Sequence, residues 1–298
     1  MAIHRSHCLL SLEYHKDRYL VQFFFSLFCN NLPDIDNLKD GKIFMCADDT
    51  TLYAIAPNHD LVAIILNKTE FLLMSRKKFN GPVQCIKLGG SKINQVKSTR
   101  CLGLQIDCNL CWNSNVSELI LSFTQKLNLL KSLYFLPTNA KLDFYFKVIL
   151  PSINYGILVW GSCGKTLFNE LEKIHVRAAK VILGLDWYTP KRDVLAKAKW
   201  FTLKTMYKQQ LLFFSYKHYY NLLTTEMQSL LTKRSHRYEL RDKISYVVPK
   251  PNTEYLKKSI SYQAVTLWNS VDKELKSTNS FARFKEAVKA LYQSSYIK

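Results

Sequence analysis

Two adjacent carboxylates, Asp48 and Asp49, stand between two short apolar, β-prone runs, and this pattern constrains the fold more than any other feature of the sequence. The run Lys42–Cys46 predicts one strand and the run Thr51–Ile55 a second. Residues 47–50 would then form a tight connection with both carboxylates at its tip. Carboxylate oxygens suit a hard cation such as Mg²⁺. Most Asp-Asp pairs are solvated turn residues, however, so the pair alone does not define a metal site.

The charge of the chain indicates a polyanionic partner. Its 298 residues carry 42 Lys and Arg against 23 Asp and Glu, a formal net charge of +19. From Pro190 to the C-terminus there are 21 basic and 8 acidic residues, so the last third is the most basic part. Seventeen Tyr, seventeen Phe and five Trp lie among these charges. Cations next to aromatic rings favour nucleic acid as the binding partner, although most aromatic residues belong to protein cores.

The cysteines and the apolar segments bear on the cellular compartment. Eight cysteines lack the spacing of a disulfide framework, and the pair Cys108 and Cys111 has no further ligand pair at a distance suited to zinc. Reduced thiols are typical of a cytoplasmic or nuclear protein. The apolar segment Tyr19–Cys29 resembles a signal peptide, but it is too short to span a bilayer and has no small-residue cleavage site. A buried helix or strand is therefore favoured, and no membrane partner is expected.

Short strands are predicted as far as residue 107. Leu61, Ile64 and Ile65 suggest a helix, whereas Thr69–Met74 suggests a strand, so residues 58–73 are ambiguous. A further hairpin is predicted around the Gly89-Gly90 turn, and residues 101–107 predict one more strand.

After Trp112 the apolar residues recur every three or four positions, which is typical of amphipathic helices. Pro137 should stop the first helix, Pro151 should end or kink the second, and Gly184 should close the third. Helices are predicted over residues 116–134, 142–153, 167–181, 202–223, 261–276 and 280–292.

Basic residues on the third predicted helix are candidate phosphate ligands. Lys173, Arg177 and Lys180 recur at spacings of four and three, which places them on one outer face. An ordinary solvated helix face is an equally good interpretation. A second candidate group, Lys233, Arg234 and Arg237, lies in a basic run nearer the C-terminus.

Several segments, in order, resemble the C-terminal half of a non-LTR (LINE or jockey-like) retrotransposon reverse transcriptase. The hairpin Cys46–Tyr53 is similar to the catalytic hairpin of that family. Ordered agreement of this kind is more specific than one motif match. The other similar segments are Leu27–Pro33, Asn67–Phe71, Cys101–Asp107 with Trp112, Leu150–Gly156 with Val159–Gly161, and Ser261–Tyr262 with the Leu267–Asn269 box.

The resemblance implies an RNA-directed DNA polymerase that uses an RNA template and a DNA primer, with no obvious protein partner. In such enzymes two Mg²⁺ ions are held by three palm carboxylates. Asp48 and Asp49 match two of these, as catalytic residues and metal ligands. The third should lie upstream in an apolar strand that ends in Asp, and Asp17 stands instead in a polar, charged context.

Catalysis by this chain alone is therefore not expected, because its sequence supplies two of three carboxylates and no fingers. Residues 61–67 also replace a longer amphipathic helix of the family. The alternatives are a non-catalytic remnant that binds nucleic acid and a decayed product without a selected function.

The expected fold class is α+β. Three parts are predicted: a truncated palm of antiparallel strands over residues 1–110, a helical thumb-like segment over 111–188, and a basic, mostly helical region over 189–298.

Overall fold

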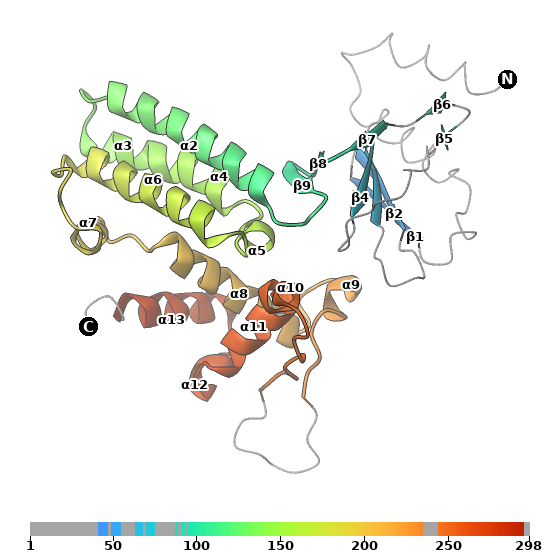
Figure 1. Cartoon of the computed structure of the whole chain (residues 1–298). Helices are drawn as coiled ribbons and strands as arrows, with labels where there is room; N and C mark the ends of the chain where they lie inside the picture. The colour runs from blue at the N-terminus through green and yellow to red at the C-terminus, as the bar shows by residue number, and fades with distance from the viewer. Residues whose placement is uncertain are drawn as a thin grey trace, which may run out of the picture. The chain divides into compact units, whose positions relative to one another are not determined.

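A computed structural model describes residues 41–46, 49–54, 63–67, 70–74, 87–88, 91–92, 94–234 and 244–294 (Figure 1). The chain divides into two units, Met1–Leu110 with the strands and Cys111–Lys298 with the helices. The further division that the sequence suggests at residue 188 stays a prediction. Among the helices of the described residues, none has the length and apolar character needed to cross a bilayer.

The first two strands form the expected hairpin. β1 (Gly41–Cys46) pairs antiparallel with β2 (Asp49–Ala54), and the register sets Cys46 opposite Asp49. β2 therefore begins two residues before the expected Thr51. Asp49 is its first residue, and Ala47 and Asp48 fall outside the described residues.

The hairpin extends into a five-stranded sheet. β3 (Ala63–Asn67) and β4 (Glu70–Met74) are antiparallel, and β7 (Asn94–Val96) adds in parallel to β4. The strand order is β1-β2-β3-β4-β7. The helix suggested by Ile64 and Ile65 is thus wrong. These residues belong to a strand that pairs on both sides, and ladder hydrogen bonds to two neighbours override a short apolar period.

Two small hairpins complete the strands. β5 (Lys87–Leu88) pairs with β6 (Ser91–Lys92), and β8 (Ser98–Cys101) pairs with β9 (Leu104–Asp107). The single strand predicted over residues 101–107 is wrong. Leu102 and Gly103 have φ angles of 47° and 78°, so they form a two-residue turn that reverses the chain. Leucine is an unusual residue at positive φ, so the local sequence carries no clear turn signal at Leu102.

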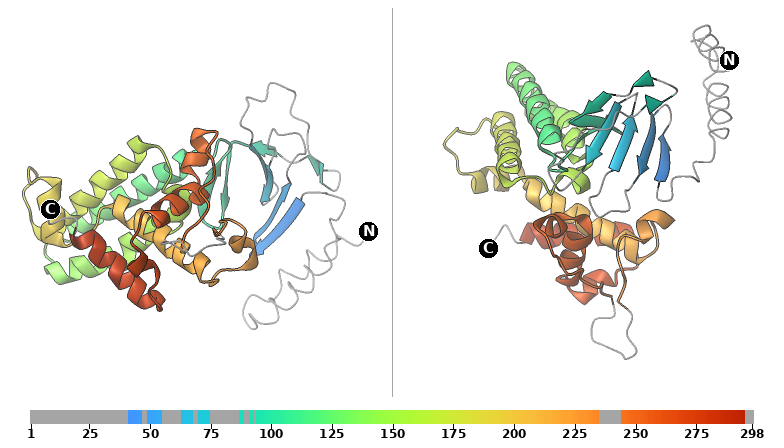
Figure 2. Two further views of the ribbon diagram at one scale, coloured as in Figure 1. Left: turned by 90° about the horizontal axis from the view of Figure 1, so that it is seen from below. Right: turned by 45° about the vertical axis from the view of Figure 1, so that its right-hand side comes forward.

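Two long helices of the helical unit, α2 (Asn113–Ser132) and α6 (Lys165–Leu183), pack side by side (Figures 1 and 2). Phe123, Leu127 and Leu130 are buried on α2, and Leu171 and Ala178 are buried on α6. Each large apolar side chain buried in this way contributes about 1.5–3 kcal/mol. The elements of the unit are α2 (Asn113–Ser132), α3 (Thr138–Phe144), the π-helical turn η1 (Tyr145–Ile149), α4 (Leu150–Asn154), α5 (Ile157–Trp160), α6 (Lys165–Leu183), α7 (Lys191–Ala198), α8 (Leu203–Tyr219), α9 (Thr225–Gln228), α10 (Glu254–Lys258), α11 (Ile260–Asn269), α12 (Lys273–Lys276) and α13 (Phe281–Ser294).

Pro151 does not end the second predicted helix, because α4 continues to Asn154. It lies in the first turn of α4, directly after the π-helical turn, where Leu150 N–H bonds to the Tyr145 carbonyl. Proline lacks an N–H and is accommodated where the helical hydrogen-bond pattern shifts. The helix predicted over residues 142–153 is therefore three short segments, α3, η1 and α4.

The last helices pack against α8, as Figures 1 and 2 show. Phe284 and Val288 of α13 are buried, but Leu291 is 43% exposed, so the expected apolar face is shorter than predicted. The single helix predicted over residues 261–276 is also wrong: α11 ends at Asn269 and α12 begins at Lys273. The Asn269 side chain bonds to the backbone of Tyr246, which fixes the chain where it leaves α11.

Candidate nucleic-acid interface

The outer face of α6 brings three predicted basic residues together. Helical spacing turns Ile174 and Ala178 into the core and leaves Lys173 and Arg177 exposed, with Lys180 half-buried. α6 ends at Gly184, whose φ of 61° is the left-handed conformation that glycine adopts readily. The predicted helix end at Gly184 and the outward position of Lys173 and Arg177 are confirmed, whereas their role as phosphate ligands stays a prediction.

A turn after α6 places the Trp187 ring beside two of these cations and exposes the next residue, Tyr188, to solvent. The Asp186 side chain accepts the Tyr188 N–H at 3.1 Å, and its carbonyl accepts the Thr189 N–H, also at 3.1 Å. Lys180 Nζ donates to the Trp187 carbonyl. The turn therefore presents Trp187, 55% exposed, and Tyr188, 89% exposed, to solvent.

Two cations lie over the Trp187 ring. The Arg177 guanidinium is 5.2 Å from the ring centroid, and Lys180 Nζ is 5.6 Å from it. Cation–π contacts of this length contribute about 0.5–1 kcal/mol at exposed sites. They hold both charges close to the turn instead of leaving them free in solvent.

These residues surround a pocket of about 420 Å³. Four cationic side chains and one carboxylate line it, so the pocket favours an anion. The lining residues are Asn169, Glu172, Lys173, Val176, Arg177, Lys180, Trp187 and Lys191.

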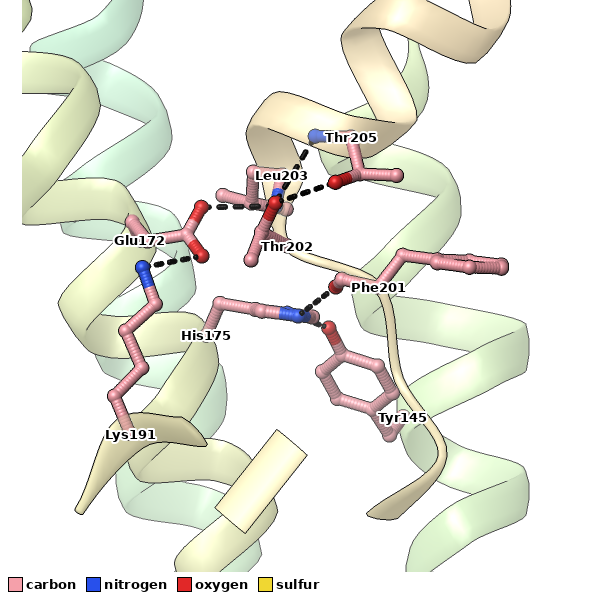
Figure 3. Close-up of polar contacts among 8 residues, drawn as sticks. All are labelled: Tyr145, Glu172, His175, Lys191, Phe201, Thr202, Leu203 and Thr205. Atoms are coloured by element: carbon pink, nitrogen blue, oxygen red, sulfur yellow. Dashed lines mark hydrogen bonds and ion pairs between the residues drawn. The ribbon is translucent and has the colours of Figure 1, made fainter. Parts of the chain in front are cut away.

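One lining residue of the pocket, Glu172, also belongs to a buried polar network (Figure 3). The Glu172 carboxylate lies 3.0 Å from Lys191 Nζ through one oxygen, and its other oxygen accepts the Leu203 N–H at 2.8 Å. The Thr202 hydroxyl caps α8 by accepting the Thr205 N–H at 3.0 Å. Glu172 thus adds a negative charge at the N-terminus of α8, where the helix dipole favours it.

His175 forms a second group of buried polar contacts, next to that of Glu172 (Figure 3). Its Nε2 is 2.9 Å from the Phe201 carbonyl, which can only accept, so Nε2 carries the proton. Nδ1 then accepts from the Tyr145 hydroxyl. Burial lowers the pKa of His175, against an opposing effect of Glu172, and burial raises the pKa of Tyr145. The imidazole of His175 and the phenol of Tyr145 are therefore neutral at pH 7, and they are hydrogen-bonded to each other inside the fold.

The second basic group does not join the first in any described contact. Lys233 Nζ donates to Asn221 at 2.7 Å and lies 5.3 Å from the Tyr219 ring centroid, so it holds the chain beyond α8. Arg234 is exposed, and its N–H bonds to the Ser245 carbonyl. Arg237 lies outside the described residues.

The predicted metal ligands cannot be assembled from the described residues. Asp48 lies outside them, and Asp49 is placed by its backbone as the first residue of β2. Within the described part of the chain, no three Cys, His, Asp or Glu side chains form a group able to hold a metal ion. The Mg²⁺ site at Asp48 and Asp49 stays a prediction.

The sequence patterns do not indicate four residues of this candidate site: Glu172, Trp187, Tyr188 and Lys191. In the sequence, Trp187 marks only a break in the helical pattern. The Trp-Tyr pair after a glycine stop and a basic helix was an available signal. Glu172 and Lys191 offered none, because their pairing depends on how α7 folds back onto α6.

Known proteins match only part of the chain. It is similar over 113 residues to the RNA-directed DNA polymerase from mobile element jockey of Drosophila melanogaster, with 23% identity, and of Drosophila funebris, with 24% identity. The match covers 37% of this chain and 12% of each relative, so the chain spans about one eighth of their length. No family model and no solved structure matches. The similarity supports a partial relationship to retrotransposon reverse transcriptases.

Proposed function

We propose that the chain corresponds to a C-terminal fragment of a non-LTR reverse transcriptase and that its helical unit binds nucleic acid. The relationship is supported by the partial similarity to jockey polymerases and by the ordered motifs of the sequence. In this proposal the sheet β1-β2-β3-β4-β7 is part of an α+β palm, and α2 to α6 are thumb-like.

One observation carries the binding proposal: Lys173, Arg177, Lys180 and Lys191 converge around the exposed Trp187. Lysine and arginine neutralise phosphates and release condensed counterions, which drives binding to any nucleic acid. Glu172 pairs with Lys191, so the uncompensated positive charge is concentrated on the outer face of α6.

Salt dependence tests this proposal. Affinity for a short duplex should fall steeply between about 50 and 200 mM salt. In the double variant Lys173→Gln, Arg177→Gln, binding should weaken, and the slope of log K against log salt should become shallower by about 0.9 for each phosphate that the variant no longer neutralises. Neither side chain contributes to the core, so the variant should fold normally.

A matched control separates this face from net charge. Lys131 on α2 and Lys289 on α13 are exposed, and Lys131→Gln, Lys289→Gln removes the same two charges elsewhere. An equal decrease of affinity in both double variants would refute a localised interface. Salt-independent binding, or none at low salt, would refute nucleic-acid binding itself.

We further propose that this chain does not extend primers by itself. Asp48 and Asp49 would be ligands of the Mg²⁺ ions that polymerases use to activate a primer hydroxyl and stabilise the leaving pyrophosphate. With two carboxylates, metal binding should be weak and poorly positioned. Primer extension on an RNA template with Mg²⁺ tests this: activity that disappears in Asp48→Ala would overturn it.

A further inference from the structure

We propose that the turn holding Trp187 and Tyr188 makes the basic face of α6 a site for single-stranded nucleic acid, in which a base stacks on Tyr188 between phosphates held by the α6 cations. The inference rests on the proposed nucleic-acid binding and adds the class of ligand. It follows from how the turn is built and from what surrounds it.

The ring of Tyr188 is exposed to solvent, although its backbone is fixed by a hydrogen bond. It is 89% exposed, while its backbone is held by the Asp186 carboxylate at 3.1 Å. A ring on a hydrogen-bonded turn loses little conformational freedom when a ligand stacks on it, which favours binding. Most tyrosines of α8 are half-buried or buried among other rings, so Tyr188 differs from them in what it offers a ligand.

The neighbouring Trp187 holds two of the α6 cations in place beside the turn. Arg177 and Lys180 lie over its ring, and Lys180 Nζ also bonds to the Trp187 carbonyl, directly before the Tyr188 N–H. A base on Tyr188 would therefore have two cations next to its flanking phosphates. Combining stacked aromatic rings with a basic groove is how proteins bind single strands without reading their sequence.

In a double helix, neighbouring base pairs cover the faces of every base except those at the duplex ends. A duplex can contact the cations of α6 but cannot offer an internal base to Tyr188. Stacking by a protein aromatic ring contributes about 5- to 150-fold in affinity per base. The site should therefore prefer a single strand to a duplex of the same length.

The test compares an oligo(dT) strand of about 12 nucleotides with a blunt duplex of the same length, using the full chain. The parent should bind the strand more tightly. Tyr188→Ala should weaken binding to the strand by about 5- to 150-fold and leave duplex binding nearly unchanged. Tyr188→Trp should restore the affinity, and the emission of its new ring should be quenched by oligo(dT).

Tyr134→Ala is the matched control, because Tyr134 is also 80% exposed but lies in the connection between α2 and α3. It should not change affinity for the strand. Polyglutamate serves as an acidic competitor: displacement of oligo(dT) at equal charge would identify a general anion site and overturn the inference.

The outcomes distinguish this inference from the proposed function. Binding that depends on Lys173 and Arg177 but not on Tyr188, or equal affinity for strand and duplex, would remove the stacking site and keep the basic interface. Absence of binding to both probes would remove the proposed function as well.

Discussion

Glu172 accepts the first backbone N–H of α8: its Oε2 lies 2.8 Å from Leu203 N, although 31 residues separate the two in the sequence. Its other oxygen pairs with Lys191 of α7. One side chain of α6 thus connects the starts of the next two helices. An unpaired N–H at a buried helix end destabilises the fold, so Glu172 is important for stability beyond its charge.

Replacing Glu172 by glutamine should lower the free energy of unfolding by about 1–3 kcal/mol. If the amide oxygen accepts from Leu203, the amide NH₂ must face the Lys191 ammonium, so one contact becomes repulsive. Urea unfolding followed by tryptophan fluorescence measures the change, because Trp160, Trp200 and Trp268 are buried in this unit. Glu170→Gln, on the exposed face of α6, should have little effect. Equal stability of the two variants would contradict this role.

His175 should make the stability of the helical unit depend on pH. Burial lowers its pKa in the folded chain below the value of 6.5 that applies to the unfolded chain. The unfolded state therefore binds more protons between these two values, and stability falls as the pH drops below about 6.5 until it reaches the folded pKa. Thermal unfolding between about pH 5 and pH 8 measures this slope.

The variant His175→Gln isolates that contribution. Glutamine does not titrate, so the slope of Tm against pH should become shallower, even though the variant is less stable at pH 7. His218, whose pKa is also lowered by burial, keeps its own contribution in both proteins. An unchanged slope would show that His175 does not titrate differently in the two states.

The sequence predicted the elements whose signal is local. The three- and four-residue spacing located α2, α6 and α8, Gly184 located the end of α6, and the apolar runs around Asp49 located the first hairpin. It failed where a distant contact decides. The break after Asn269 depends on the hydrogen bonds between the Asn269 side chain and the backbone of Tyr246, 23 residues away. At Leu102 the sequence simply carries no signal for a positive φ.

In the candidate site, too, the sequence predicted what depends on local spacing and missed what depends on distant contacts. Helical spacing alone placed Lys173, Arg177 and Lys180 on one face. The contribution of Trp187 and Lys191 depends on the turn after Gly184 and on the return of α7 to α6. Asp48 and Asp49 were identified by resemblance, and their role as metal ligands stays a prediction.

Gly161 should not tolerate a side chain. A Cβ at this position would come within 2.4 Å of both the Ile157 carbonyl and the Tyr207 ring. Tyr207 is buried and its hydroxyl donates to Gln263 at 2.9 Å, so it cannot move aside without breaking that bond. Gly161→Ser should therefore cost about 1–3 kcal/mol in the free energy of unfolding. Urea unfolding measures it.

Gly164→Ser provides the comparison three residues later. Nothing lies within 4 Å of a Cβ there, and Gly164 has a φ of −58° at the N-cap of α6. Serine is a favoured N-cap residue, so this variant should be as stable as the parent or slightly more stable. Equal destabilisation at both positions would show that close packing at Gly161 is not the cause.

Asn269 should be as sensitive to substitution as Gly161, because its side-chain amide forms two hydrogen bonds with the backbone of Tyr246. Its Oδ1 accepts the Tyr246 N–H at 3.0 Å, and its Nδ2 donates to the Tyr246 carbonyl at 3.0 Å. Together with the Trp268 indole, which donates to the Ile244 carbonyl at 3.1 Å, it fixes the extended segment beside α11. The Leu267–Asn269 box thus has a structural role in this chain.

Asn269→Asp should lower the free energy of unfolding by about 1–3 kcal/mol at pH 7. The carboxylate can still accept from the Tyr246 N–H, but its second oxygen then faces the Tyr246 carbonyl without a proton between them. Asn128→Asp adds the same charge on an exposed position of α2 and should change stability by only a few tenths of a kcal/mol. Urea unfolding of the two variants decides: if Asn269→Asp is no less stable than Asn128→Asp, the paired amide does not hold this segment.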